Sequence, residues 1–362
     1  MRRWNTQHKW NTLFKRICAV AALACAAFAA AAAEANSWQQ INQELGRPEG
    51  WQQIAQHSAF VLGEPTSLGQ VGDQEAFSIP FGSYPNIDGS TVAVPMAVEF
   101  ARQHIRLSDE DLQGFVFFST THGAYQNLIR REPGGLTMIA SAFAQMDADQ
   151  PVDLIIVTEP SEDELALARE HGVGLVQEPV CYDAFVFIAH KDNPVDNLTV
   201  ADLRRIYAGE VTSWQAFGGP DVKILAYQRE PNSGSQTAME KMVMEGRPMT
   251  GAQPLTIVTG MGELVQRVGA YEDRAHSLGY TYLYYIDTLY RSDDIKVLSI
   301  DGISPTPENI RSGAYPFSTN YYGVIRAGDE DETGGQFLTW MLGEEGQRCI
   351  AQAGYIPMME VR

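Results

Sequence analysis

From about residue 76 onward, short apolar runs alternate along the chain with stretches in which apolar residues recur every three or four positions. The short runs indicate β-strands, and the spaced apolar positions indicate amphipathic helices. We expect strands at 76–81, 114–118, 152–157, 175–180, 184–189, 223–227, 280–285, 296–299 and 321–325, and helices at 92–104, 122–131, 161–172, 199–207, 237–246, 263–270, 307–311 and 335–353. Because strands and helices alternate throughout, the pattern predicts an α/β protein with mostly parallel sheets.

Three of the predicted helices follow polar turns that are rich in small and hydroxyl residues. These turns contain Ser90 and Thr91, then Ser119, Thr120 and Thr121, and finally the stretch from Arg229 to Gln236. A helix N-terminus carries unpaired N–H groups and the positive end of the helix dipole, so it favours an anion. Three such helix starts, far apart in the sequence, predict two lobes that face one cleft.

The third turn carries the most specific chemistry. Gly234 lets a ligand approach the backbone, and Ser233 and Ser235 add hydroxyl donors. Arg229 supplies a planar guanidinium that can bind two oxygens at once. This set suits a tetrahedral oxyanion. The alternative is that a serine only caps the helix and that Arg229 is a surface charge paired with an acid, and capping is likewise the alternative for the hydroxyls at 119–121.

The helix after this turn has its own start and stop signals. Thr237 and Glu240 have the spacing of a capping box, and Gly246 is suited to end the helix. Ser161 and Glu164 form a second capping box earlier in the chain. We therefore expect helices to begin next to Thr237 and Ser161.

The N-terminus has the pattern of a secretory signal peptide. Basic residues precede an Ala-rich apolar run at 17–33, and the first acid is Glu34. We expect residues 1–33 to be removed and the remaining chain to be periplasmic or secreted. The run is short and weakly apolar for an uncleaved membrane anchor. A lipid anchor at Cys25 is the alternative, although the apolar residues continue past this cysteine.

Removal of residues 1–33 lowers the number of Lys and Arg from 26 to 21 against 45 Asp and Glu, which leaves a net charge of −24. Such an acidic surface disfavours nucleic acid and anionic membranes as partners. An anion must therefore be bound locally, inside a cleft. Two cysteines remain, Cys181 and Cys349, and the sequence does not show whether they pair. No Cys/His pair has metal-ligand spacing, so we expect neither a metal nor a cofactor.

Several segments match one known family in the same order along the chain. They are YPNIDGST (84–91), DAFVFIAHKDNPV (183–195), LTVADLRRIYAGEVTSW (198–214) and REPNSGSQT (229–237), with weaker matches at 278–285, 313–317 and 345–357. Over about residues 76–358 the chain resembles the substrate-binding proteins of bacterial phosphate ABC transporters, which belong to the type II periplasmic-binding-protein superfamily. The resemblance implies a two-lobe fold with 76–180 plus 320–362 as lobe I and 181–319 as lobe II, preceded by an extension at 34–75.

The resemblance also implies that phosphate lies between the lobes and that the lobes close by a hinge motion. Carried over by position, the ligand-binding residues would be Ser90, Thr91, Ser119, Thr120, Thr121, Arg229, Ser233, Gly234, Ser235 and Gln236. Phosphate-specific relatives also place a carboxylate in the cleft, which accepts the remaining proton of the anion and rejects sulfate. Glu159 is our candidate for this carboxylate. Asp88 is the alternative, although a turn aspartate more often bonds its own backbone.

These features predict a binding protein, not an enzyme, that captures inorganic phosphate or a similar oxyanion as a monomer and delivers it to an inner-membrane ABC permease. The alternatives are a ligand sensor or degenerate binding clamp and, less favoured, a phosphoester hydrolase. Hydrolysis needs an activated nucleophile or metals, and the sequence has neither a G-x-S-x-G nor a Ser-x-x-Lys motif. We assign no role to His122, assign the aromatic residues at 115–118 and 280–285 to the core, and note that the insertion at 133–150 lies outside the family pattern.

Overall fold

The computed structural model describes residues 84–105, 118–134, 150–250, 257–258, 260–270 and 276–361, all of which lie within the compact unit Ser58–Arg362. The predicted signal peptide, the extension at 34–75, the strand at 76–81 and most of the segments at 114–118 and 133–150 fall outside these residues. In the part of the chain that is described, no helix combines the length and the apolar character needed to cross a membrane.

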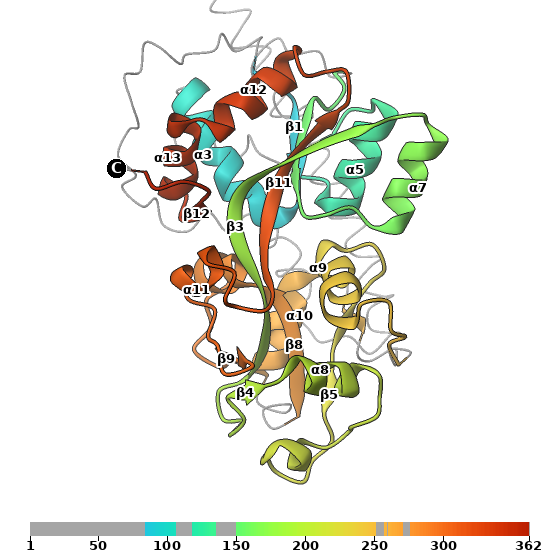
Figure 1. Ribbon diagram of the computed structural model, residues 1–362, viewed down its shortest axis with the longest axis vertical. Helices are drawn as coiled ribbons and strands as arrows, with labels where there is room; N and C mark the ends of the chain where they lie inside the picture. Colours follow the sequence, from blue (N-terminus) through green and yellow to red (C-terminus); the bar gives the residue numbers. More distant parts are fainter. Residues whose placement is uncertain are drawn as a thin grey trace, which may run out of the picture. The chain divides into compact units, whose positions relative to one another are not determined.

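Strands and helices alternate along the described chain (Figure 1). The first elements are β1 (Ile87–Gly89), the 3-10 helix η2 (Thr91–Ala93), α3 (Val94–Ile105), α5 (Thr120–Arg130), β2 (Leu154–Val157), α7 (Glu162–Glu170) and β3 (Leu175–His190). Then come β4 (Asn197–Leu198), α8 (Val200–Tyr207), the 3-10 helix η3 (Trp214–Phe217), β5 (Leu225–Ala226), β6 (Gln228–Arg229), α9 (Gly234–Ala238), the π-helix η4 (Met239–Met244), β7 (Ile257–Val258) and α10 (Met261–Gly269). The last elements are β8 (Ser277–Tyr282), the π-helix η7 (Tyr285–Leu289), β9 (Ile295–Val297), β10 (Ser299–Ile300), α11 (Pro307–Arg311), β11 (Ser318–Arg326), α12 (Thr333–Leu342), α13 (Glu344–Gln352) and β12 (Ile356–Pro357). The α/β class predicted from the sequence is confirmed.

The long strand β3 connects two groups of strands. The main sheet has the order β1-β2-β11-β3-β8-β5, with β12 and β9 also paired to β3. The pairs β1–β2 and β5–β8 are parallel, whereas β3 and β11 pair antiparallel to their neighbours. From Leu175 to Ala184, β3 pairs with β11, and from Phe185 to Ala189 it pairs with β8. Figure 1 shows this strand passing from one group of strands to the other.

The second half of β3 forms part of the core. Every residue from Asp183 to His190 is buried. Successive side chains of a strand point to opposite faces, so continuous burial means that both faces of the sheet are covered here. The Tyr280 ring on β8 packs against Phe185 and Phe187, with ring centroids 5.4 and 6.2 Å apart. The aromatic segment around 280 is therefore core, as the sequence predicted.

Several element boundaries differ from the prediction; for example, the strand expected at 280–285 is β8 (Ser277–Tyr282), and the π-helix η7 begins at Tyr285. The strands expected at 175–180 and 184–189 are one strand, because β3 continues through Cys181 and the irregularity is a register shift between Tyr321 and Tyr322 of β11. The helix expected at 335–353 is divided into α12 and α13 by Gly343, whose extended backbone (φ −77°, ψ 170°) is not helical.

The start of α9 also differs from the prediction. We expected Thr237 and Glu240 to form the capping box, but the helix begins at Gly234. The Ser233 hydroxyl accepts a hydrogen bond from Gln236 N at 3.3 Å and is therefore the N-cap. Thr237 N already donates to Ser233 O at 2.9 Å, so Thr237 lies inside the helix. The other predicted box, Ser161 with Glu164, is confirmed at the start of α7.

The two cysteines of the predicted mature chain do not form a disulfide. Cys181 on β3 and Cys349 on α13 are both buried free thiols. Burial raises the pKa of Cys349 to about 12. The thiol therefore stays protonated at neutral pH, which makes it a poor nucleophile.

Candidate functional site

The three hydroxyl-rich turns meet at one cavity of about 520 Å³. Nine of the eleven residues predicted from the sequence line it, namely Ser90, Thr91, Ser119, Thr120, Thr121, Arg229, Ser233, Gly234 and Ser235. Sheet order explains part of this convergence. Because β1 and β2 are parallel neighbours, the residues that follow them, Ser90 and Thr158, lie at the same edge of the sheet.

Three buried hydroxyl groups at the cavity wall are incompletely satisfied by the described residues around them. The Ser90 Oγ, Thr158 Oγ1 and Tyr321 OH atoms make no hydrogen bond of normal geometry to another described residue. A buried polar group without a partner costs about 1–3 kcal/mol. Donation to a bound anion would remove this cost, so these hydroxyl groups indicate a polar ligand.

Asp88 supports the second turn from behind the cavity. Its Oδ1 accepts hydrogen bonds from Gly89 N and Ser119 N, both at 2.7 Å, and its Oδ2 accepts one from Asn127 Nδ2 at 2.9 Å. Burial raises the pKa of Asp88, and these hydrogen bonds oppose the rise. Asp88 is not part of the cavity lining. Asp88 therefore bonds backbone N–H groups, as we expected for an aspartate in a turn.

The second turn leads into α5, whose first residues line the cavity. The Ser119 side chain makes no capping hydrogen bond, so helix capping does not account for this hydroxyl. Thr120 has φ +69°, a left-handed backbone conformation that β-branched residues rarely adopt. Such local strain is often found at ligand sites, where the surrounding structure holds it. Thr121 and His122 continue the lining.

Arg229 is held in place by contacts on several sides. Its backbone N donates to Gln236 Oε1 at 3.1 Å and to Tyr280 OH at 3.0 Å. Its Nε donates to Val258 O at 2.9 Å, and its NH1 lies 3.4 Å from Ser235 Oγ. These contacts fix the guanidinium group at the cavity that Arg229 lines.

The oppositely charged residues Arg229 and Glu230 both line the cavity. Burial lowers the pKa of Arg229, because the cation loses its hydration. An anion in the cavity would stabilise the cation. Among the described residues that line the cavity, Glu230 is the single carboxylate. Burial raises the pKa of Glu230, and the charges of Arg229 and His122 oppose the rise.

The third turn brings its backbone very close to the residues of the second turn and of β2. A Cβ atom built on Gly234 would lie 2.5 Å from Thr158 Oγ1 and 2.9 Å from Thr121 Oγ1. Both distances are shorter than van der Waals contact, so only glycine fits. The Tyr282 OH donates to Gly234 O at 3.1 Å and holds the turn from the other side. Ser233 caps α9 and also lines the cavity, so its capping role does not remove it from the candidate site.

Two predicted residues lie outside the cavity lining. Gln236 lies behind Arg229, where its Oε1 accepts from the Arg229 backbone and its Nε2 donates to Glu240 at 2.8 Å. Glu159 has a side chain that is 54% exposed and lies 3.8 Å from Lys241 Nζ. It follows Thr158 directly at the end of β2, and neighbouring residues of an extended chain point to opposite sides. Because Thr158 faces the cavity, Glu159 faces away.

The cavity also contains residues that the sequence analysis did not assign to it. These are chiefly His122, Thr158, Glu230, Tyr282, Tyr285 and Tyr321. The first three are direct sequence neighbours of Thr121, Glu159 and Arg229, so their position beside predicted site residues was the available signal. The tyrosines are buried. Their apolar pattern indicated core, and it gave no sign that the same side chains border a cavity.

Comparison with known proteins places these features in a family context. The family model of a PBP superfamily domain matches residues 140–345. The phosphate-binding protein PstS of Borreliella burgdorferi is 28% identical over 188 residues, which cover 51% of this chain and 66% of that protein. The phosphate-binding protein PstS of Bacillus subtilis is 26% identical over 190 residues, which cover 52% of this chain and 59% of that protein. The chain thus matches less than two thirds of the length of either relative.

A solved structure is similar over a larger part of the fold. A putative phosphate ABC transporter substrate-binding protein from Clostridium perfringens, with bound phosphate, superposes with a TM-score of 0.54 at 25% sequence identity. The match covers 75% of this chain and 98% of that chain. A phosphate transport receptor from Vibrio cholerae, 21% identical with a TM-score of 0.51, shares the fold.

Proposed function

The chain belongs to the PBP superfamily, and from this premise we propose that it is an extracytoplasmic solute-binding protein that captures inorganic phosphate for an ABC importer. The named functions of the PstS relatives and the phosphate bound to the Clostridium perfringens protein support this ligand. In this proposal the protein binds and releases phosphate without forming a covalent bond to it. It is released from its signal peptide, or is anchored at Cys25 in the alternative, and it delivers phosphate as a monomer to an inner-membrane permease.

One observation carries the proposal: hydroxyl groups from three turns, the first residues of α5 and the guanidinium of Arg229 surround a single cavity. A tetrahedral anion presents oxygens in four directions and needs donors on several sides. Ser90 and Thr158 supply hydroxyls at the sheet edge, and Arg229, which lines the same cavity, supplies positive charge. Charge-assisted hydrogen bonds from such donors are about twice as strong as neutral ones.

Glu230 is the proposed acceptor for the proton that phosphate retains near neutral pH. Glu159 was expected in this role, but it faces away from the cavity toward Lys241. Glu230 lines the cavity beside Arg229. A carboxylate accepts a hydrogen bond from a protonated phosphate oxygen, whereas it repels sulfate, which carries no proton. The proposed selectivity for phosphate therefore depends on Glu230.

The strand pairing supports the proposed division into two lobes. Residues 76–180 with 320–362 contain α5, α7 and the part of the β3–β11 pairing from Leu175 to Pro179, and residues 181–319 contain α10 and the part of β3 that pairs with β8. Cavity residues come from both proposed lobes. A hinge in β3 and β11 would open and close the cavity around the anion.

The decisive experiment is calorimetric titration of the mature protein with phosphate, sulfate and arsenate at pH 6 and pH 8. We expect tight binding of phosphate and arsenate and at least tenfold weaker binding of sulfate. Mass spectrometry of ligand released from the denatured protein provides an independent identification. A different small molecule in that spectrum, together with no heat from phosphate, would refute the proposed ligand.

A further inference from the structure

A short turn at the start of α7 contacts both sides of the cavity without lining it. We call residues 159–164 the α7 turn. Its conformation is fixed by a reciprocal capping box in which Ser161 N donates to Glu164 Oε2 at 2.6 Å and Glu164 N donates to Ser161 Oγ at 3.4 Å. Ser161 and Glu164 are both buried. The turn is thus a rigid part of the first proposed lobe.

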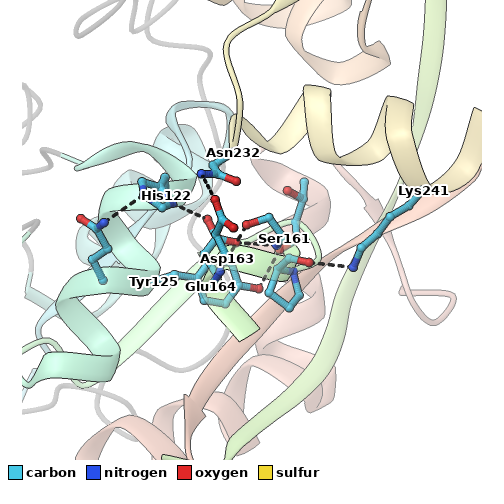
Figure 2. A network of polar contacts seen from close by, with 10 residues as sticks. His122, Tyr125, Ser161, Asp163, Glu164, Asn232 and Lys241 are labelled. Carbon is cyan, nitrogen blue, oxygen red and sulfur yellow. Dashed lines mark hydrogen bonds and ion pairs between the residues drawn. The ribbon is translucent and has the colours of Figure 1, made fainter. Parts of the chain in front are cut away.

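On one side the α7 turn holds a lining residue of its own lobe. Glu164 Oε1 lies 2.9 Å from His122 Nδ1, and Gln126 Nε2 lies 2.9 Å from the other ring nitrogen. Both ring nitrogens of His122 are therefore engaged (Figure 2). This arrangement fixes the ring of His122 at the cavity edge.

On the other side the α7 turn contacts the second proposed lobe at two points. Asn232 Nδ2 donates to Asp163 Oδ2 at 2.9 Å. Lys241 Nζ donates to Pro160 O at 2.7 Å and lies 3.8 Å from Glu159 Oε2. Figure 2 shows Asn232 and Lys241 reaching the turn from two separate places. Asn232 and Lys241 lie on either side of Gly234 in the sequence, and Gly234 itself closely approaches Thr158.

The residue held by Asp163 is itself part of the cavity wall. Asn232 lines the cavity and has φ +63°, a left-handed conformation that asparagine tolerates better than most residues. Lys241 belongs to the π-helix η4, which continues directly from α9. The two contacts therefore fix both ends of the segment 232–241, and this segment carries Ser233, Gly234 and Ser235.

We infer that Asp163 and Lys241 are positioning residues that hold segment 232–241 against the α7 turn and thereby stabilise the closed cavity. Neither residue lines the cavity, so neither touches the anion. This inference rests on the proposed function, because it concerns closure around bound phosphate. Contacts between the two proposed lobes shift the population toward the closed form and slow ligand release.

The expected effects follow from the exposure of these contacts. The Lys241 side chain is 32% exposed and the Glu159 side chain 54%, so solvent weakens the ion pair. We expect each truncation to raise the dissociation rate of phosphate about fivefold, the factor that corresponds to one partly exposed charged contact. The association rate changes less, because neither Asp163 nor Lys241 lines the cavity that the anion enters.

The variants are Lys241→Met, which keeps the length of the side chain, Asp163→Ala and the double variant. Asp163→Asn keeps an oxygen that can accept from Asn232 Nδ2, so its phosphate release rate should stay close to that of the wild type, unlike that of Asp163→Ala. Lys191→Met is the matched control, because Lys191 forms a similar exposed pair with Asp294 at 2.6 Å away from the cavity lining. Stopped-flow kinetics measure phosphate release, and the melting temperature without ligand measures stability.

Hydrogen exchange of the amides at 229–244 without ligand tests the contact itself. We expect faster exchange in the double variant and no change in the Lys191→Met control. Failure of the wild type to bind phosphate would refute the proposed function, and the exchange data would still test the contact. Unchanged release rates and unchanged exchange in the double variant would overturn the positioning role. A decrease in the ligand-free melting temperature that fully accounts for the change in affinity would also overturn the positioning role.

Discussion

Replacement of Gly234 by alanine tests whether the two walls of the cavity must touch for the anion to be held. The added Cβ would lie 2.5 Å from Thr158 Oγ1, and ordinary van der Waals contact begins at 3.4 Å. The walls would have to separate by about 0.9 Å at this point. Overpacking of this kind costs about 1–3 kcal/mol, which corresponds to a roughly 5- to 150-fold rise in Kd.

The assay is calorimetric titration with phosphate together with a melting curve of the ligand-free protein. Because the contact joins the two proposed lobes, we expect the affinity to fall while the ligand-free melting temperature changes little. Gly260→Ala is the control, because Gly260 lines the same cavity and its added Cβ would meet nothing closer than 4.0 Å. Wild-type affinity in Gly234→Ala would refute the reasoning.

Three further predictions concern charge. Arg229→Ala should weaken phosphate binding at least tenfold in calorimetry, because a charge-assisted hydrogen bond contributes about 1.5–3 kcal/mol, and an unchanged Kd would contradict the role of the guanidinium. Glu230→Gln should keep phosphate binding but admit sulfate in a competition titration, and undiminished rejection of sulfate would move the proton acceptor elsewhere. Burial raises the pKa of Asp183 to about 7 from its usual 3.8, so the wild type should lose up to about 4 kcal/mol of stability as the pH rises from 4 to 8. Asp183→Asn should flatten this slope in melting curves, so its stability relative to the wild type should rise with pH, and a difference that does not vary with pH would contradict the assignment.

Local chemistry accounts for the parts of the fold that were predicted well. The capping box of Ser161 and Glu164 forms because its hydrogen bonds join residues three positions apart, so no distant contact is needed. The start of α11 at Pro307 follows in the same way from a proline in the first turn and from the Thr306 cap. Where distant contacts decide, prediction fails. The strand β3 continues through Cys181 because β11 pairs along it, and the extra residue Val180 is accommodated as a bulge in β3 opposite the step from Tyr321 to Tyr322.

The same division applies to the site. Sequence alone determined the class of protein and the hydroxyl-rich turns, and it predicted that Arg229 belongs to the site, since residue type and short spacing fix which groups can donate to an anion. Only the tertiary structure showed which of the two carboxylates lines the cavity. Glu159 and Glu230 differ little as sequence features, but the end of β2 turns Glu159 toward Lys241, and Glu230 stands beside Arg229 in the wall. The direction of a side chain depends on the strand that carries it and on the element packed against it, and neither can be determined from neighbouring residues.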